Sequence, residues 1–219
     1  MGRGQDRAYD ILRQRLVGGH YEPGTQLREE QLAREFGLSR TPIRSALHRL
    51  VEDGLANADA GRGVHVAQWS EHDIEEMFQI RILLEPYASK LAAERGGDGL
   101  IDGLRGCNRQ MALALSTTGS GAIELIQEAN RTFHHLLLDH AHSPRLRGIL
   151  DTMIDMPVIT RSFHLLERDE LEQSLHHHQD LTLAVEAGDG ELAREVMRMH
   201  LRISHHRFIK HRIAWRRPS

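Results

Sequence analysis

The stretch from Arg28 to Leu55, REEQLAREFGLSRTPIRSALHRLVEDGL, predicts two short helices joined by a tight turn. Leu32 and Phe36 lie four residues apart, so they share one face of the first helix. Gly37 ends that helix, because a residue without a Cβ adopts the left-handed conformation after a helix at little cost. Only Leu38 and Ser39 then lie between Gly37 and the expected start of the second helix.

The second helix begins near Ser39 or Thr41, either of which can cap it, and Pro42 is tolerated in its first turn. Its inward residues have helical spacing and are Ile43, Leu47, Leu50 and Val51. The residues off that stripe are basic or carry a hydroxyl group: Arg40, Thr41, Arg44 and Arg49. A buried seam with such side chains at the start of the second helix is typical of a helix-turn-helix that reads DNA. The alternative is a helical hairpin with a solvated charged face.

The next segment favours DNA binding over that alternative. Two short extended runs flank Gly61-Arg62-Gly63, which predicts a β-hairpin with a tight basic tip. A helix-turn-helix followed directly by a hairpin is a winged helix. Arg62 is then a candidate for contact with the minor groove or with phosphate.

Residues 9–66 resemble the DNA-binding domain of the GntR family of bacterial transcription regulators. The resemblance lies above all in LSRTPIRSALHRLVEDGL from Leu38 and GRGVHV from Gly61. It implies that DNA contacts come from the second helix and the wing: Ser39, Arg40, Thr41, Arg44, Arg62 and Gly63, with Arg49 added from its position off the apolar stripe. Glu30 stands where relatives carry a basic residue, so we assign it no contact.

The charge of the chain predicts selective rather than bulk attraction to DNA. The 219 residues carry a formal net charge of −3. Residues 1–68 hold ten arginines, no lysine and nine acidic residues, or +1; the remainder holds eighteen basic and twenty-two acidic residues, or −4. Binding would therefore depend on a few placed arginines, doubled in a dimer.

Other features predict a cytoplasmic protein without a membrane partner. No apolar run approaches the roughly 18 residues of a membrane span, and the first fifteen residues lack the apolar core of a signal peptide. The one cysteine, Cys107, cannot form an internal disulfide, which agrees with a reducing compartment.

The rest of the chain predicts helices only. A first helix is expected at residues 7–18, and later ones at about 70–95, 98–116, 120–141, 143–155, 157–166, 169–187 and 189–213. The expected fold is mostly α. A winged helix-turn-helix with three helices and a β-hairpin occupies residues 1–68, and an all-α bundle occupies residues 69–219.

Three of the sixteen histidines fall within apolar helical seams. The first seam consists of Ile123, Ile126, Leu137 and Ala141, and it contains His134 with Asn130 one turn before it. The second consists of Leu171, Leu175, Leu181 and Val185, and it contains His178. The third consists of Leu192, Val196 and Ile203, and it contains His200. Of the consecutive His176, His177 and His178, at most one can join an internal site, because neighbours on a helix point about 100° apart.

A metal site is the expected use of these residues. A buried imidazole requires a partner, and three that converge on one core are satisfied more readily by a metal than by each other. We predict a mononuclear site from Asn130, His134, His178 and His200, with Zn, Ni or Mn as the ion. Such a site leaves one or two positions open, which suit a carboxylate.

The same half of the chain resembles the FCD domain, which accompanies this winged helix in the branch named after the fatty-acid regulator. The matching pieces are Gln79 to Pro86, Asn130 to His134, His178 with the helix leading to Asp189, and Met197 to Leu201. The resemblance implies a small organic acid as the effector. Arg81 is the candidate for gripping the acid by a bidentate pairing, and Arg161 is a weaker one. The alternative for Arg81 is an intrahelical pair with Glu85.

The sequence therefore predicts a bacterial transcription regulator that is not an enzyme, with repression as the expected mode. It would bind an inverted-repeat operator in double-stranded DNA as a homodimer, because one winged helix covers too few base pairs for useful specificity. The acid at the metal site would control operator affinity. The alternatives are a purely structural metal, or a metal-dependent enzyme with Asp155 or Glu128 as general base.

Overall fold

The structure is a computed structural model that describes residues 2–17, 20–59, 61–117, 121–156, 159 and 162–215. It has two compact units. The N-terminal unit comprises Met1–Ser70 with Asp155–Arg161, and the C-terminal unit comprises Glu71–Ile154 with Ser162–Ser219. None of the described helices has the length and apolar content of a membrane span.

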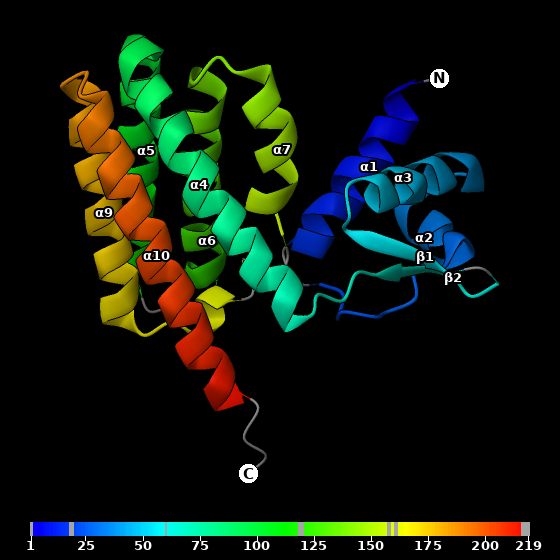
Figure 1. Cartoon of the computed structure of the whole chain (residues 1–219). Coiled ribbons are helices and arrows are strands. Elements are labelled where there is room, and N and C mark those ends of the chain that lie inside the picture. Colours follow the sequence, from blue (N-terminus) through cyan, green and yellow to red (C-terminus); the bar gives the residue numbers. More distant parts are fainter. Residues whose placement is uncertain are drawn as a thin grey trace. The chain divides into compact units, whose positions relative to one another are not determined.

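The N-terminal unit contains three helices and a β-hairpin, as the sequence predicts (Figure 1). The elements are α1 (Gly2–Val17), α2 (Glu29–Phe36), α3 (Arg40–Glu52), β1 (Ala56–Asp59) and β2 (Gly63–Val66). The two strands are antiparallel, with Ala56 opposite Val66 and Asp59 opposite Gly63. The other edge of β2 is covered, because the Leu27 amide donates to the Val64 carbonyl at 2.8 Å. The wing is thereby anchored to the segment that leads into α2.

The turn between α2 and α3 has the predicted chemistry at its glycine but not at its serine. Gly37 has a φ of 63°, and the amide of Leu38 donates to the carbonyl of Ala33 at 3.0 Å. Ser39 occupies the N-cap of α3 with extended backbone, yet its hydroxyl makes no cap hydrogen bond. The predicted hydroxyl cap is therefore absent at Ser39, which leaves this side chain exposed for other contacts.

The apolar face of α3 packs against α1 and the hairpin. The core of this unit includes Leu12, Leu16, Ile43, Leu47, Leu50, Leu55 and Val66, all of which are buried. Full burial of one leucine side chain stabilises the folded state by about 1.5–3 kcal/mol. This core fixes which face of α3 turns outward.

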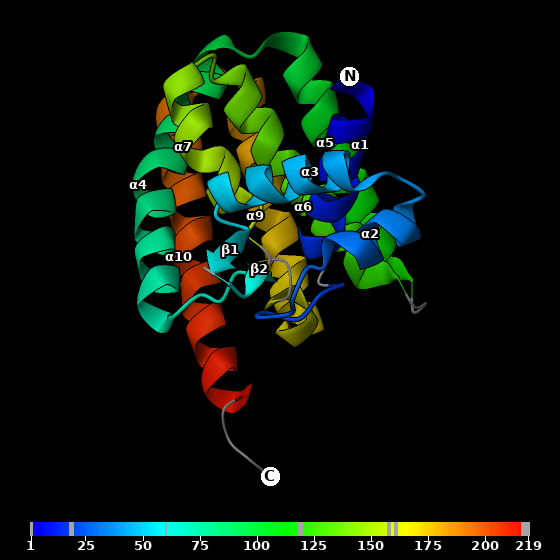
Figure 2. The ribbon, with the colours of Figure 1, turned by 90° about the vertical axis from the view of Figure 1, so that its right-hand side faces the viewer.

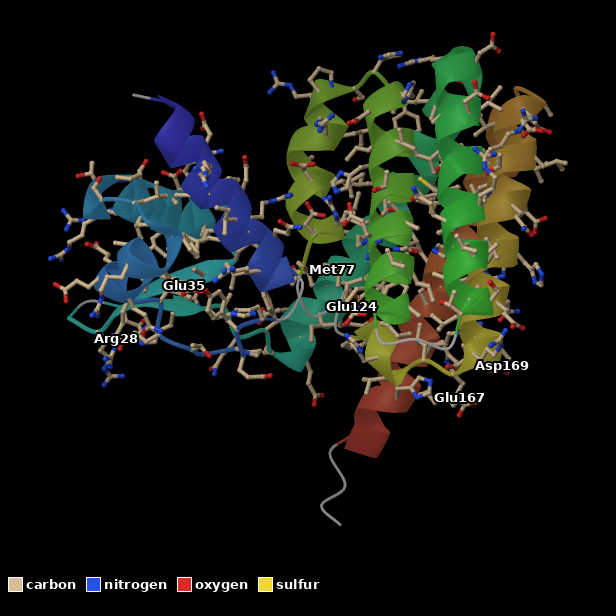
Figure 3. The ribbon with its side chains drawn as sticks, turned by 180° about the vertical axis from the view of Figure 1, so that it is seen from behind. Arg28, Glu35, Met77, Glu124, Glu167 and Asp169 are labelled. Atoms are coloured by element: carbon tan, nitrogen blue, oxygen red, sulfur yellow. The ribbon has the colours of Figure 1, made fainter. Side chains whose placement is uncertain are left out.

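The described secondary-structure elements of the C-terminal unit are all helices. Its elements are α4 (Glu71–Arg95), α5 (Gly97–Ser116), α6 (Ala122–His140), α7 (Pro144–Ile154), the 3-10 helix η1 (Phe163–Leu165), α9 (Arg168–Glu186) and α10 (Gly190–Trp215). The helix predicted at 157–166 falls partly outside the described residues; of those described, Ile159 and Ser162 are helical and Phe163–Leu165 form η1. A capping box between Glu167 and Glu170 starts α9, close to Asp169 (Figure 3).

Helices α4 and α10 run antiparallel, side by side (Figures 1 and 2). Lys90 pairs with Glu191 near one end, and the rings of Phe78 and Phe208 lie 5.7 Å apart near the other. Helices α6 and α9 pack into the same core, where Phe133, Leu137 and Leu181 are at most 1% exposed. Helix α5 adds Leu100, Leu104 and Cys107 to this core, so five of the described helices contribute to one interior.

One predicted seam is wrong in part. The seams of α6 and α9 are buried as expected, apart from the half-buried Ile123, but Leu192 of α10 is 40% exposed. The buried residues of α10 include Ala193, Met197, His200 and Leu201. Eight residues of an α-helix turn through about 800°, so Leu192 points about 80° away from His200. The inward position of His200 does not depend on that error.

Candidate metal centre and DNA-binding surface

Three histidines from three helices meet inside the C-terminal unit. His134 of α6, His178 of α9 and His200 of α10 are 3%, 1% and 3% exposed. One nitrogen of each lies within 4.8 Å of one nitrogen of the other two. The ring of His178 also stacks on Phe133, with centroids 4.1 Å apart and planes 6° apart, which fixes its orientation. The three residues picked from apolar seams therefore converge in one place.

Two nitrogens of this cluster lack hydrogen-bond partners among the described residues. Nε2 of His178 and Nδ1 of His200 are buried and accept or donate no hydrogen bond within the described part of the chain. Burial lowers the pKa of both imidazoles well below the ordinary value, and neighbouring histidines lower it further. Both rings are neutral at pH 7 and carry a free lone pair, which is the form that binds a metal ion.

The donor set fits a divalent ion. Imidazole nitrogens bind Zn²⁺ at about 2.0–2.1 Å, so two ligands of one ion lie within about 4.2 Å of each other. A small approach of the rings brings the cluster onto one ion. Asn130 lies one turn before His134 on α6 and is half-buried, so its predicted role as a fourth ligand stays a prediction.

Glu85 connects the cluster to Arg81. Both residues belong to α4 and are at most 4% exposed. Oε1 of Glu85 accepts a hydrogen bond from Nε of Arg81 at 2.5 Å, and Oε2 lies 2.6 Å from Nδ1 of His134. Burial raises the pKa of Glu85, but Arg81 and His134 outweigh that effect and lower it to about 2. Glu85 is therefore a carboxylate across the physiological pH range.

Arg81 makes the intrahelical pair that was the alternative to an effector contact. The bond to Glu85 uses its Nε, which leaves Nη1 and Nη2 as donors. The charge of Arg81 is close enough to His200 to help lower the pKa of that imidazole. The pair and an acid contact are thus compatible. Arg161, the weaker candidate, lies outside the described residues.

Sequence reasoning missed two residues beside the cluster. It treated Glu85 only as a partner for Arg81, although the contact with His134 spans 49 positions of the chain. It allowed at most one of the three consecutive histidines at an internal site. Besides His178, however, His177 is buried, its Nδ1 has no partner among the described residues, and its ring lies 5.7 Å from that of His200. Helical spacing shows which residues share a face but not which helix that face meets.

The two carboxylates suggested as general bases each pair with an arginine. Glu128 is exposed on α6 and pairs with Arg131 at 3.1 Å. Asp155 belongs to the N-terminal unit and pairs with Arg13. Glu85 is near the cluster, but a carboxylate with a pKa of about 2 is a weak base at neutral pH. This geometry disfavours hydrolytic chemistry that relies on these three residues.

A second candidate site is the outward face of α3. Ser39, Arg40, Thr41 and Arg44 are all exposed there. Arg44 donates to both carboxylate oxygens of Glu29, at 2.8 and 2.9 Å, and Arg40 donates to Glu30 at 2.9 Å. These arginines line a surface hollow of about 570 Å³ that extends to Gly63 of the wing. Arg28, at the N-cap of α2, is exposed beside it (Figure 3).

The other predicted DNA contacts lie at the wing and at the end of α3. Arg62 is exposed at the hairpin tip, and its carbonyl accepts a hydrogen bond from the side chain of Gln26. Arg49 is engaged by α1, because its guanidinium lies 3.9 Å from the ring centroid of Tyr9 and pairs with Asp6. A DNA contact from Arg49 stays a prediction. The same side chain already contacts α1.

Comparison with known proteins shows which family this chain belongs to. Residues 5–66 match the model of bacterial regulatory proteins of the gntR family, and residues 76–203 match the FCD domain. A helix-turn-helix with an exposed basic helix, joined to a helical domain, defines a DNA-binding transcriptional regulator. The FCD match covers more than half of the chain, so this protein belongs to the FCD-containing GntR family.

Individual relatives agree with that class. The chain is 29% identical over 192 residues to the uncharacterized HTH-type transcriptional regulator YdhC of Bacillus subtilis (strain 168), covering 88% of this chain and 85% of that protein. It is 28% identical over 198 residues to the HTH-type transcriptional repressor GlaR of Escherichia coli (strain K12), covering 88% and 90%. The solved structure of E. coli McbR/YncC is similar in fold, with a TM-score of 0.85, 23% identity and coverage of 96% and 99%.

Proposed function

We propose that this regulator is a cytoplasmic bacterial repressor whose operator affinity is controlled by a small organic acid. The acid would bind in the C-terminal unit beside a divalent ion held by His134, His178 and His200, with Asn130 as a fourth ligand. The observation that carries the proposal is the cluster of buried imidazoles with unpartnered nitrogens next to a buried arginine. Neutral imidazoles without partners are costly to bury, so a ligand that uses them gains affinity.

The residues around the cluster have distinct roles in this proposal. When bound, the ion supplies open coordination positions for a carboxylate. His178 and His200 hold their lone pairs free because burial keeps them neutral. Arg81 offers two terminal nitrogens in the planar geometry that pairs with a carboxylate. The site would therefore select an anion with at least one carboxylate group.

The N-terminal unit would bind the operator through α3 and the wing. Arg40 and Arg44 present guanidinium groups that can pair with guanine edges or phosphate, and Ser39 and Thr41 add hydroxyl donors. Arg62 would reach the minor groove or its phosphates. Two copies in a homodimer would read the two halves of an inverted repeat.

Helix α4 is a covalent route by which the acid would act on DNA binding. It begins at Glu71, directly after the N-terminal unit, and it carries both Arg81 and Glu85. An acid that binds one arrangement of α4 better than another shifts the protein toward that arrangement. The N-terminal unit (Met1–Ser70 with Asp155–Arg161) and the C-terminal unit (Glu71–Ile154 with Ser162–Ser219) would thus be coupled through this helix.

Thermal unfolding tests the proposal directly. We expect one small organic acid from a panel to raise the unfolding temperature of zinc-loaded protein and to leave chelator-treated protein unchanged. A ligand at 100 times its dissociation constant adds about 2.7 kcal/mol, or roughly 5–10 °C for a chain of this size. The same acid should change operator affinity in a fluorescence anisotropy titration. Stabilisation by zinc with no effect of any acid would instead favour a purely structural metal, and turnover of a bound acid would favour an enzyme.

Glu30 gives a separate prediction for the DNA-binding surface. Its carboxylate pairs with Arg40 and adds negative charge where phosphates would approach. The Glu30→Gln variant is expected to bind DNA of unrelated sequence severalfold more tightly, with a similar gain on operator DNA. Titrations at one fixed salt concentration measure both affinities. Glu52→Gln, at the exposed C-terminal end of α3, is the matched control and should change neither.

A further inference from the structure

The carboxylate of Glu85 contacts two side chains, those of Arg81 and His134. One oxygen accepts from Arg81 on the same helix, and the other faces Nδ1 of His134 on α6. All three residues are at most 4% exposed. No water competes for these contacts at such burial, so each partner constrains the position of the next.

The pairing of Glu85 with Arg81 determines where His134 carries its proton, because the guanidinium donates to one carboxylate oxygen and the other faces His134 as an acceptor. An ionised carboxylate only accepts hydrogen bonds, so Nδ1 of His134 must be the donor. A neutral ring protonated at Nδ1 has its lone pair at Nε2. The rings of His178 and His200 lie 5.6 and 5.3 Å from that of His134, and Nδ1 is already engaged. Nε2 is therefore the nitrogen that remains to serve the cluster.

We propose that Glu85 is a positioning residue that holds His134 in the tautomer and orientation needed to bind a divalent ion through Nε2, and that Arg81 holds Glu85 in place. This inference rests on the proposed metal site and deepens it. A histidine ligand oriented through its second nitrogen by a carboxylate is bound more firmly and is more basic, and losing such a partner typically lowers metal affinity 10- to 100-fold.

Two other roles for Glu85 predict different results. If Glu85 were a direct ligand of the ion, replacing it would still weaken metal binding after His134 had been removed. If the pair with Arg81 were only part of the helical core, replacing Glu85 would change stability but not metal affinity in folded protein. The experiment therefore has to show whether replacing Glu85 changes metal affinity through His134 or independently of it.

The first measurement uses the wild-type protein in metal-free form. We expect a long-range ¹H–¹⁵N spectrum at pH 7.5 to show His134 protonated at Nδ1 and unprotonated at Nε2. His134 protonated at Nε2 would overturn the proposal. This readout requires no variant and no metal, so it remains decisive even if substitutions at Glu85 prevent folding.

The second measurement is a double-mutant cycle on zinc affinity, determined by competition with a chromophoric chelator. Glu85→Gln is expected to weaken zinc binding 10- to 100-fold, because the amide can donate as well as accept and no longer selects one tautomer. In a His134→Ala background the same change should have less than a twofold further effect. An equal loss in both backgrounds, or unchanged affinity in folded Glu85→Gln, would contradict the proposal.

Glu94→Gln is the matched control. Glu94 is also on α4, but it is more exposed and lies near Lys90, so zinc affinity should not change. The cycle also distinguishes the failure of this inference from the failure of the proposed function. Wild-type protein that binds no zinc at all would refute the metal site itself, whereas equal binding by wild type and Glu85→Gln would refute only the role of Glu85.

Discussion

Replacing His178 by leucine is expected to remove the stabilisation by metal without destabilising the metal-free protein. Nε2 of His178 is buried without a partner among the described residues, and an unsatisfied buried polar atom costs about 1–3 kcal/mol. Leucine removes that cost and fills similar space, although it loses the stack on Phe133, worth about 0.5–1.5 kcal/mol. The free energy of unfolding in chelator should stay unchanged or rise by up to about 2 kcal/mol.

With zinc bound, the wild type should have a larger free energy of unfolding than the His178→Leu variant. An ion present at 1,000 times its dissociation constant stabilises the wild type by about 4.1 kcal/mol, and the variant should lose nearly all of that gain. Urea unfolding with excess chelator and with excess zinc measures both differences. His176→Leu, an exposed neighbour on the same helix, is the control and should retain the response to zinc. A His178→Leu variant that is less stable than the wild type by the same amount in chelator and in zinc would show that His178 serves packing and not metal binding.

Replacing Arg44 by alanine is expected to give the largest loss of operator binding. One side chain that reads a base contributes roughly 5- to 150-fold in affinity, and a homodimer loses two copies. The cost to folding should be small, because Arg44 is exposed and its pair with Glu29 is a surface pair. Fluorescence anisotropy with operator DNA at fixed salt measures the loss, while zinc content and unfolding temperature should remain those of the wild type.

Arg105→Ala is the control for the change in charge. Arg105 is exposed, pairs with Glu186 at 2.8 Å, and belongs to the C-terminal unit. Its removal should leave operator binding nearly intact. A loss of zinc together with DNA binding in Arg44→Ala would indicate misfolding, and unchanged operator affinity would remove Arg44 from the set of DNA contacts.

The sequence was sufficient where local rules decide the structure. Gly37 marked the turn because few other residues adopt a positive φ cheaply, and the period of the apolar residues placed His134, His178 and His200 on inward faces. Residue spacing did not reveal Glu85 as a partner of His134, because that contact depends on how α4 packs against α6. The same limit applies to Leu192, where the third seam was drawn without knowing which side of α10 meets α4.

The burial of the histidine cluster also has a kinetic consequence. Side chains that are 3%, 1% and 3% exposed are shielded from solvent, so an ion or acid that binds at the proposed site would enter when the helices separate briefly. Association would then be limited by the opening rate of the bundle and not by diffusion, and a bound molecule would leave no faster than the bundle reopens. Such a regulator would not follow changes in effector concentration that are shorter than the interval between openings of the bundle. It would respond to changes that last longer than that interval.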